Sequence, residues 1–227
     1  NAMSFAASIS ELIKETSTNL PSDVRRMMAK AFASEEAGSL SKVALETICQ
    51  NIDMAKNKGT PICQDTGMPT FLIDVPSGFN QGEFEATIKD EVEKATKVGI
   101  LRPNSVDSVT GKNSGNNLGP GTPVIHFHQH DKNEIVVKLA LKGGGSENVG
   151  AQYKLPDGKL GAGRDLEGVR RAVLDAVVDA QGKGCAPGVL GICIGGDRVS
   201  AFEESKRQLL RPLKDTNPVP ELAELED

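Results

Sequence analysis

The sequence has no long hydrophobic run, no excess of positive charge and no closely spaced pair of cysteines. Its longest apolar runs, at residues 135–137 and 188–194, are much shorter than the roughly 20 residues that a membrane-spanning helix needs. Lysine and arginine are dispersed along a chain of net charge −5, which argues against nucleic acid or an anionic membrane as a partner. Four cysteines without a Cys-x-x-Cys pair argue against a disulfide-rich secreted scaffold and a self-contained zinc finger. We therefore predict reduced cysteines and a cytoplasmic location.

With 227 residues, the chain is long enough for one large domain or two small ones, and it can bury about 70% of the surface that its unfolded form exposes. We expect one domain over residues 1–210. Residues 211–227 carry three prolines and are predicted to form a tail or a linker toward a further segment. Asn1-Ala2 before Met3 resembles the remnant of a cleaved expression tag, and nothing after it resembles a signal peptide.

Apolar residues recur at helical spacing in several segments of the chain. Ser8 followed by Glu11 fits a capping box that opens a first helix, and a second helix is predicted after Pro21. The third helix ends near Gly59 because Pro61 prevents its continuation. The same spacing predicts this third helix and later ones over residues 40–58, 84–98, 165–180 and 200–210.

Runs of β-branched residues predict strands at residues 70–75, 123–128, 134–141 and 189–194. The second and third of these runs are separated by five polar residues, which is the pattern of a hairpin. Helices mixed with strands, at least two of them antiparallel, predict an α+β or irregular α/β fold. We expect a mixed or antiparallel sheet with helices packed around it.

A thiol, an amide and a carboxylate stand side by side at Cys63-Gln64-Asp65, in a loop bounded by Pro61 and Gly67. Thiolates serve as metal ligands or nucleophiles. A neighbouring amide and carboxylate can orient a substrate or move a proton. This composition is typical of a binding site and not of a packed interior.

A second lone cysteine, Cys185, lies in another glycine- and proline-containing loop at residues 182–188. A free cysteine is often a small buried hydrophobic residue, but a loop setting favours function for both Cys63 and Cys185. Cys49 lies inside a predicted helix and Cys193 inside a predicted strand. We expect these last two side chains to be part of the core.

Three consecutive glycines, Gly143, Gly144 and Gly145, cost conformational entropy on folding that a plain turn does not require. They therefore indicate close approach of the backbone to a ligand. Their N–H groups could hold a carboxylate or phosphate; a flexible exit from the hairpin is the alternative. Residues 102–122 form a loop rich in Asn, Ser, Gly and Pro, and loops of this length are usually functional or disordered. Arg102 could clamp a carboxylate with its planar fork, or be a solvated surface arginine.

His126 and His128 alternate along one predicted strand and therefore face the same side. Paired imidazoles could suit a metal, and an exposed strand face is the other interpretation.

Four motifs occur in an order that resembles one family: residues 61–67, 101–103 and 142–148, and then residues 185–187 with 194–197. The order resembles the iron-sulfur hydro-lyases, namely class I fumarate hydratase and the α subunit of L-tartrate dehydratase. The resemblance extends over nearly the whole chain from about Ser8. It does not separate the two substrates.

The resemblance implies an oxygen-sensitive [4Fe-4S] cluster held by three cysteine thiolates, with one iron open to a substrate carboxylate and hydroxyl. Cys63 and Cys185 match two of these ligands. The open iron would act as a Lewis acid on the hydroxyl. By the same matching, the substrate side would be lined by Gln64, Asp65, Arg102, Gly143, Gly144 and Gly145, with Asp65 close to proton transfer.

The chain departs from the family in two ways. The third cluster cysteine of the family lies C-terminal to a segment like residues 211–213, and neither Cys49 nor Cys193 stands at that place. The family also completes its active site with a second domain or a β subunit, in dimers or α2β2 assemblies. We therefore expect a truncated chain that is inactive and cluster-free by itself and that exposes a face for its partner.

Two other hypotheses remain. One is a non-enzymatic module in which the three glycines and Arg102 bind a carboxylate or another anion and the thiols are structural. The other places zinc on Cys63, Cys185 and either His126 or His128, because zinc accepts mixed sulfur and nitrogen ligands.

Overall fold

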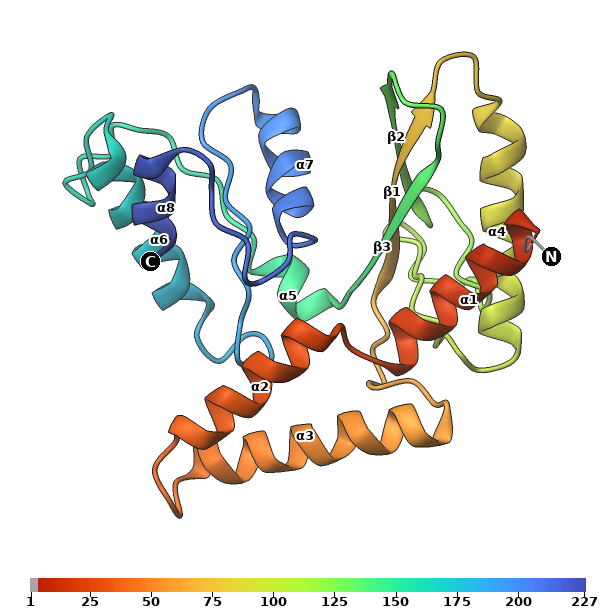
Figure 1. Ribbon diagram of the computed structural model, residues 1–227, viewed down its shortest axis with the longest axis horizontal. Helices are drawn as coiled ribbons and strands as arrows, with labels where there is room; N and C mark the ends of the chain where they lie inside the picture. The colour runs from red at the N-terminus through yellow and green to blue at the C-terminus, as the bar shows by residue number, and fades with distance from the viewer. Residues whose placement is uncertain (1–3) are drawn as a thin grey trace. The chain divides into compact units, whose positions relative to one another are not determined.

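The computed structural model describes residues 4–227, which divide into two compact units that meet in sequence between Gly144 and Gly145. Each unit is considered by itself. The first unit contains the helices α1 (Phe5–Thr18), α2 (Ser22–Ser34), α3 (Leu40–Lys58) and α4 (Gln81–Lys97), and the strands β1 (Met68–Pro76), β2 (Val124–His130) and β3 (Val136–Lys142) (Figure 1). The short helix α5 (Gly144–Asn148) follows at the boundary, and the second unit continues with α6 (Leu166–Ala180), α7 (Arg198–Gln208) and α8 (Pro220–Glu226).

The three strands form one mixed sheet of order β2-β1-β3, in which β1 is parallel to β2 and antiparallel to β3. This confirms the predicted α+β class with a mixed sheet. The predicted hairpin is wrong, because β1 lies between the strands that were expected to pair. Residues 131–135 connect the two outer strands, and five residues can cross the roughly 10 Å that a central strand occupies. The near-continuous burial of β1 is typical of such a central strand.

One face of the sheet is covered by α1 and α4, and the main hydrophobic core lies between these two helices and the sheet (Figure 1). The side chains of Ile13 on α1, Phe71 on β1 and Ile88 on α4 are completely buried. Full burial of each such side chain stabilises the folded state by about 1.5–3 kcal/mol relative to leaving it exposed. The apolar residues that recur every 3.6 positions in the helices, and at every second position along β1, therefore pack together in a single apolar layer.

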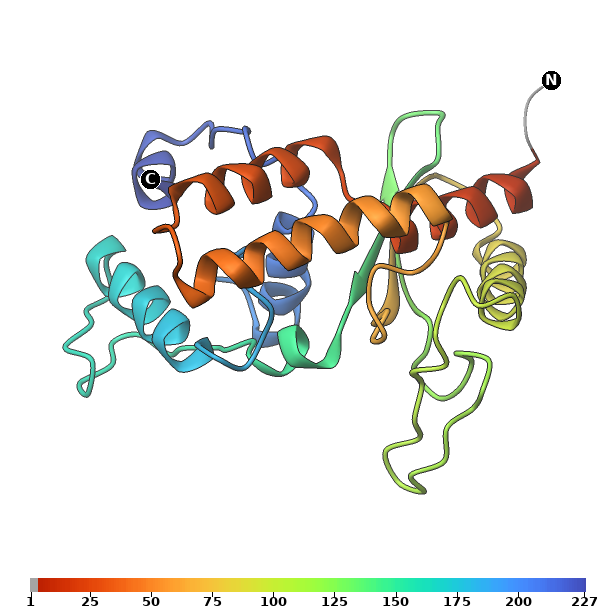
Figure 2. The same ribbon diagram turned by 90° about the horizontal axis from the view of Figure 1, so that it is seen from below.

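The helix pair α2 and α3 has a smaller core of its own, formed by Met28, Leu45 and Ile52. Figure 2 shows the two helices side by side. Gly59 ends α3 in the left-handed conformation, with φ 62°, as a C-terminal glycine often does. Cys49 is half-buried and packs against this cluster, so its predicted core position is confirmed in part.

The first helix begins one turn before the predicted capping box. Ser4 is its N-cap, and the Ser4 hydroxyl accepts a hydrogen bond from the Ala7 N–H at 3.3 Å. The prediction of a cap at Ser8 with Glu11 is therefore wrong, since both residues lie inside α1. A serine one turn earlier satisfies the free N–H groups of the first turn equally well.

In the second unit, α6 begins after Asp165, whose carboxylate accepts from the Gly168 N–H at 2.7 Å. The predicted strand at residues 189–194 is wrong: this segment is irregular, and the structure of residues 145–227 holds no strand for it to pair with. Cys193 is accordingly half-buried and not in a core. Gly191 packs closely against α7, since a Cβ there would lie 2.1 Å from the Ser205 carbonyl oxygen.

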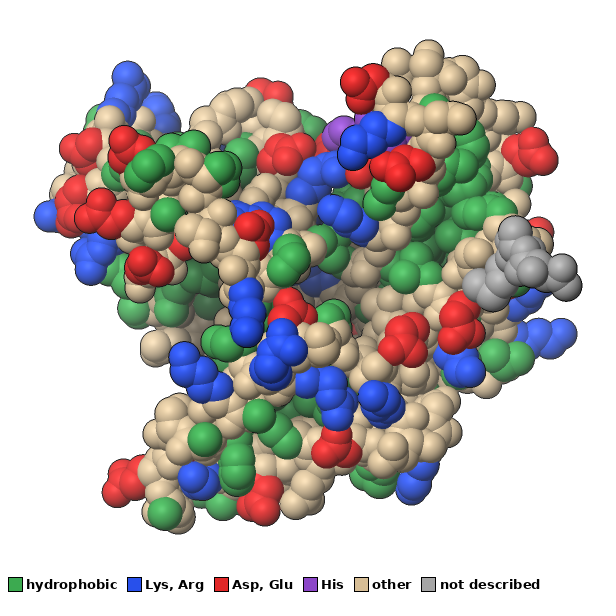
Figure 3. Space-filling view, viewed as in Figure 1, with side chains coloured by type: hydrophobic (Ala, Val, Ile, Leu, Met, Phe, Trp, Pro, Cys, Tyr) green, Lys and Arg blue, Asp and Glu red, His purple; other side chains and the backbone are tan. Residues whose placement is uncertain are grey.

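The predicted tail, residues 211–227, includes α8, and Arg211 binds Glu226 on that helix at 2.8 Å. Its role as a linker remains a prediction. Among residues 4–227, no helix combines the length and apolar character needed to cross a membrane. On the face drawn in Figure 3, basic and acidic side chains are interspersed.

Candidate functional site

The loop that carries Cys63 is fixed at the preceding residue from two sides. The Ile62 N–H donates to the Ser17 carbonyl at the end of α1 (3.0 Å), and the side-chain amide of Asn51 on α3 donates to the Ile62 carbonyl (2.7 Å). Cys63 itself is a free, exposed thiol. The structure therefore places Cys63 outside the core, on an anchored backbone, as a metal ligand or nucleophile requires.

The Asp65 carboxylate joins three segments of the first unit. It accepts hydrogen bonds from the Gly67 N–H at 2.9 Å, from the Gly144 N–H at 3.0 Å and from the side-chain amide of Asn104. Charge-assisted bonds of this kind are about twice as strong as neutral ones. Asp65 thus connects its own loop to the end of β3 and to the long loop of residues 102–122.

Two glycines allow this close approach. Gly67 has φ 84°, and a Cβ on it would lie 2.4 Å from the Lys142 carbonyl carbon. A Cβ on Gly143 would lie 3.1 Å from the Asp65 carboxylate. Close approach of the backbone, predicted for the glycine run, is therefore present, but its partner is the Asp65 loop. The Gly144 N–H donates to the carboxylate of Asp65, and the binding of a carboxylate or phosphate by this glycine run remains a prediction.

The backbone of Arg102 is held from both sides, while its side chain is exposed. Its N–H donates to the hydroxyl of the buried Thr66 at 3.1 Å, and its carbonyl accepts from the Asn117 amide at 2.7 Å. The Gln64 side chain is likewise exposed. The structure therefore gathers Asp65, the Arg102 backbone, Gly143 and Gly144, and leaves two predicted side chains open for contact with a small molecule.

The long loop of residues 102–122 is well bonded. Asp107 accepts from the N–H groups of Thr110 and Val109, which hold the pKa of its carboxyl below the usual range, and the Asn113 amide donates to the Pro103 carbonyl at 2.6 Å. Figure 2 shows the loop extending away from the sheet. Sequence reasoning missed Asn104 and Asn117 here. The abundance of asparagine was the available signal, because its side chain readily bonds nearby backbone.

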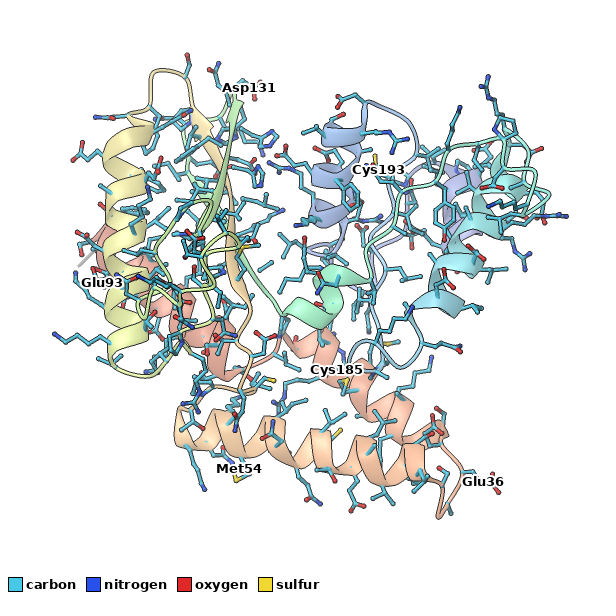
Figure 4. The ribbon with its side chains drawn as sticks, turned by 180° about the vertical axis from the view of Figure 1, so that it is seen from behind. Glu36, Met54, Glu93, Asp131, Cys185 and Cys193 are labelled. Atoms are coloured by element: carbon cyan, nitrogen blue, oxygen red, sulfur yellow. The ribbon has the colours of Figure 1, made fainter. Side chains whose placement is uncertain are left out.

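In the second unit, Cys185 is a free, exposed thiol, and every other residue of the stretch 181–190 is also exposed. Figure 4 shows it on the loop between α6 and α7, with Cys193 beside α7. Gly145 closely approaches the base of this loop, since a Cβ there would lie 3.0 Å from the Lys183 carbonyl oxygen. Glu147 on α5 pairs with Lys206 on α7 at 2.6 Å.

His126 and His128 face the side of the sheet opposite to the core, with Leu72 and Asp74 as their register partners on β1. Within residues 4–227, the structure shows no group of three or more His, Cys, Asp or Glu side chains that could hold one metal ion. The zinc hypothesis therefore gains no support from either unit.

Comparison with known proteins gives one consistent result. The chain matches the family model described as "Fumarate hydratase (Fumerase)" over residues 6–227. It is 52% identical over 223 residues to "Putative fumarate hydratase class I" of Geobacillus stearothermophilus, covering 97% of this chain and 43% of that protein. It is 34% identical over 231 residues to "Putative L(+)-tartrate dehydratase subunit alpha" of Methanocaldococcus jannaschii, covering 99% of this chain and 78% of that protein.

A third relative, "L(+)-tartrate dehydratase subunit alpha" of Escherichia coli (strain K12), is 30% identical over 212 residues, covering 92% of this chain and 68% of that protein. The chain therefore spans less than half the length of the Geobacillus relative. The family match includes Cys63, Asp65, Arg102, the glycine run and Cys185. The resemblance found in the sequence is confirmed, and the chain belongs to the fumarate hydratase (Fumerase) family.

Proposed function

We propose that this chain is the part of a hydro-lyase that reversibly adds water to a small dicarboxylate or removes it. Fumarate and malate are the first candidates as substrate, and L-tartrate is the next. The observation that carries the proposal is the convergence of Asp65, Gly144 and the Arg102 segment at one end of the sheet, in a chain of the fumarate hydratase family. Addition of water to a dicarboxylate requires charge neutralisation, a polarised hydroxyl and a proton carrier.

The thiols of Cys63 and Cys185 are proposed as two of the three ligands of a [4Fe-4S] cluster. Both are free and exposed in loops, and thiolates are the usual ligands of such clusters, so the donor set fits. The cluster, when bound, would supply an iron that acts as a Lewis acid on the substrate hydroxyl. Cys49 and Cys193 are half-buried, and we propose that the third ligand comes from outside this chain.

The chain's own residues would bind and orient the substrate. The exposed Arg102 guanidinium can hold one carboxylate through two parallel hydrogen bonds. The Gln64 amide, next to Cys63 in the same exposed loop, can orient the hydroxyl. We propose that the backbone of Gly143, Gly144 and Gly145 lines the same site.

Asp65 is the proposed carrier of the carbon-bound proton. Its carboxylate is held in place by N–H groups of Gly67 and Gly144. A group fixed by backbone donors needs no reorganisation when the proton moves.

The remaining parts of the enzyme are also proposals. Two of the relatives are named as α subunits, and we propose that a β subunit or a C-terminal domain completes the active site, in a homodimer or a heterotetramer. The four free cysteines favour a reducing compartment, and we propose the cytoplasm.

Anaerobic reconstitution of the complete protein with iron and sulfide, followed by parallel assays of fumarate and L-tartrate, tests the proposal. We expect the visible cluster absorption and turnover of one substrate to be lost together in Cys63→Ser and Cys185→Ser. Cys193→Ser is the matched control and should keep both. Carboxylate binding without turnover, unchanged in both serine variants, would instead favour an anion-binding module with structural thiols.

A further inference from the structure

We propose that Asn117 and Asn104 form an amide relay that sets the position of the Asp65 carboxylate, and that both are positioning residues for the reaction proposed above. The relay runs from α4 to Asn117, then to the backbone of residues 102–105, and from the Asn104 side chain to Asp65. All of these residues lie in the first unit. The proposal rests on the proposed function for its kinetic consequences and on the geometry alone for its structural ones.

Asn117 is the inner anchor of the relay. Its side chain is buried, with 1% of its surface exposed. Its amide nitrogen donates to the Thr96 hydroxyl on α4 at 2.9 Å and to the Arg102 carbonyl at 2.7 Å. Its amide oxygen accepts from the N–H groups of Asn104 at 2.9 Å and Ser105 at 3.2 Å. Both hydrogens and both lone pairs of the amide are thus used.

These four bonds fix the amide orientation as well as the loop. Backbone N–H groups can face only the oxygen, and the Arg102 carbonyl can face only the nitrogen, so a flipped amide would lose every favourable pairing with the backbone. The anchor is rigid because the Thr96 hydroxyl also donates to the Val92 carbonyl within α4 at 2.8 Å, and Val92 is completely buried. An unpaired amide at this depth would lower stability substantially.

The conformation of Asn117 explains why an asparagine serves here. It has φ 59°, and it is the only residue other than glycine with a positive φ among residues 4–227. Asparagine adopts this left-handed conformation more readily than other residues with side chains. Glycine would also fit the backbone but would supply none of the four hydrogen bonds. The position therefore requires both the backbone conformation and the amide.

The outer end of the relay is Asn104. Its backbone N–H is held by Asn117, and its side-chain amide donates to Asp65. The same Asp65 carboxylate accepts from the Gly67 and Gly144 N–H groups. Among residues 4–227, Asn104 is thus the one side-chain donor to Asp65. Its placement depends on Asn117, which is distant from Asp65 in sequence.

The first experiment measures amide hydrogen exchange, residue by residue, on the 227-residue chain. Asn117→Gly keeps the backbone conformation and removes the anchor, and we expect exchange at Asn104 and Ser105 to become at least about tenfold faster, as the loss of one hydrogen bond predicts. Asn104→Ala should accelerate exchange at Gly67 and Gly144 severalfold, because Asp65 loses its lateral donor. The buried amides of β1 should not change in either variant.

Asn116→Ala is the matched control. Asn116 is adjacent to Asn117, and its amide binds Glu93 and the Leu118 N–H, whereas the donors to Asp65 in residues 4–227 are Gly67, Asn104 and Gly144. We expect exchange at Gly67 and Gly144 to stay as in the unaltered chain. If Asn104→Ala leaves these two amides unchanged, or if Asn116→Ala accelerates them equally, the relay is refuted, whether or not the protein is a hydro-lyase.

The second experiment measures steady-state kinetics of the complete, reconstituted protein. We expect Asn104→Ala to lower kcat by about tenfold or more with KM within about threefold, because a positioning role acts on the reacting geometry and not on substrate affinity. Asn104→Asp should lower kcat further, since it sets a carboxylate against Asp65. Unchanged kcat in Asn104→Ala, with its thermal midpoint also unchanged, would overturn the catalytic part of the proposal.

The two experiments separate the relay from the proposed function. If the unaltered complete protein shows no hydro-lyase activity, the proposed function fails, and hydrogen exchange at Gly67 and Gly144 alone decides the relay. If activity is present and Asn117→Asp lowers kcat while Asn116→Ala does not, both proposals gain support. Asn117→Asp keeps the oxygen that accepts from Asn104 and Ser105. It replaces the amide nitrogen that donates to Thr96 and Arg102. The variant therefore tests the bonds to α4 and Arg102 without removing those that hold residues 104 and 105.

Discussion

The two compact units differ in how much apolar surface they bury. In the first unit, side chains such as Phe71, Ile73 and Ile88 have no exposed surface. In the second unit, the buried apolar side chains of the described residues are Ala162, Val169 and Ala172, all of them small. Larger ones are exposed there, including Leu190 at 57% and Leu174 at 49%. The first unit therefore has a core that stabilises it, whereas the second depends more on polar contacts and helix caps.

The same contrast holds for the two loops that carry the proposed cluster ligands. The backbone next to Cys63 is tied to α1 and α3, and Asp65 beyond it has three donors. Every residue from 181 to 190, around Cys185, is exposed. Surface loops with few buried contacts open at low free-energy cost. We infer that the loop of Cys63 is the more preorganised of the two and that the loop of Cys185 is the more adaptable.

The largest difference should come from truncating one apolar side chain in each unit. Ile88→Ala in the first unit removes a completely buried side chain and should lower the free energy of unfolding by about 3–4 kcal/mol. Leu190→Ala in the second unit removes an exposed one and should change it by less than about 1 kcal/mol. Urea denaturation followed by far-UV circular dichroism measures both. Equal losses would contradict the comparison.

A smaller effect is expected from glycines that differ in their surroundings. Gly67→Ala forces a left-handed residue against the backbone of Lys142, and we expect a loss of about 2–3 kcal/mol because strain and a clash add. Gly78→Ala is the control: its φ is 77°, but no atom lies within 4 Å of the added Cβ. It should cost about 1 kcal/mol. Thermal unfolding measures both variants, and similar midpoints would show that the Asp65 loop is less tightly packed than described.

Thiol labelling compares the cysteines within each unit. Cys63 and Cys185 are exposed, whereas Cys49 and Cys193 are half-buried. We expect two thiols to react with a disulfide reagent about tenfold faster than the other two, since access limits exchange. Mass spectrometry after partial labelling identifies which two react first. Fast labelling of Cys193 would mean that the segment beside α7 opens readily.

The smallest effect concerns Tyr153, the single tyrosine of the chain. Burial first, and then its hydrogen bond and proximity to Asp175, raise the pKa of Tyr153 to about 12; the hydroxyl donates to the carboxylate at 2.9 Å. Because the pKa of the folded state is raised, the stabilising contribution is fully present below about pH 10 and is lost as the pH rises through about 12. Ultraviolet absorbance reports this single titration directly.

The matched variant for this contact is Tyr153→Phe. It removes the hydrogen bond on a partly exposed ring, so the free energy of unfolding should fall by about 0.5–1 kcal/mol at neutral pH. A titration midpoint near 10 in the unaltered chain would show that neither the burial of Tyr153 nor its contact with Asp175 is maintained in solution.

Much of the fold could be predicted from local sequence patterns. Five of the six expected helices have close to their predicted bounds, since a stripe of apolar residues and a terminal glycine such as Gly59 act locally. The partner of a strand is not a local property. Residues 123–128 and 134–141 have the sequence pattern of a hairpin. In the structure β1 lies between these two strands, and the burial of both of its faces is what indicates this central position. The strand predicted at residues 189–194 is absent for a similar reason, since residues 145–227 contain no strand with which it could pair.

The candidate site was predictable where a residue type by itself indicates chemistry. Cys63, Asp65 and Arg102 stood out by their side chains and their loop setting. Asn104 and Asn117 did not, because an asparagine in an asparagine-rich loop carries no mark of which neighbour its amide binds. Their importance becomes visible only from contacts between residues that are far apart in sequence, such as Asn104 and Asp65.

The register of the sheet has a practical consequence for protein engineering. Met68, the first residue of β1, pairs with Lys142, the last residue of β3, so the Asp65 loop and Gly143 are adjacent at one end of the sheet. The connection at residues 131–135 lies at the other end, beyond the pairs Pro76–His130 and Asp74–Val136. Exposed turns of this kind tolerate insertions and new chain ends. A tag, a fluorophore or a circular permutation placed there should leave the Asp65 loop undisturbed.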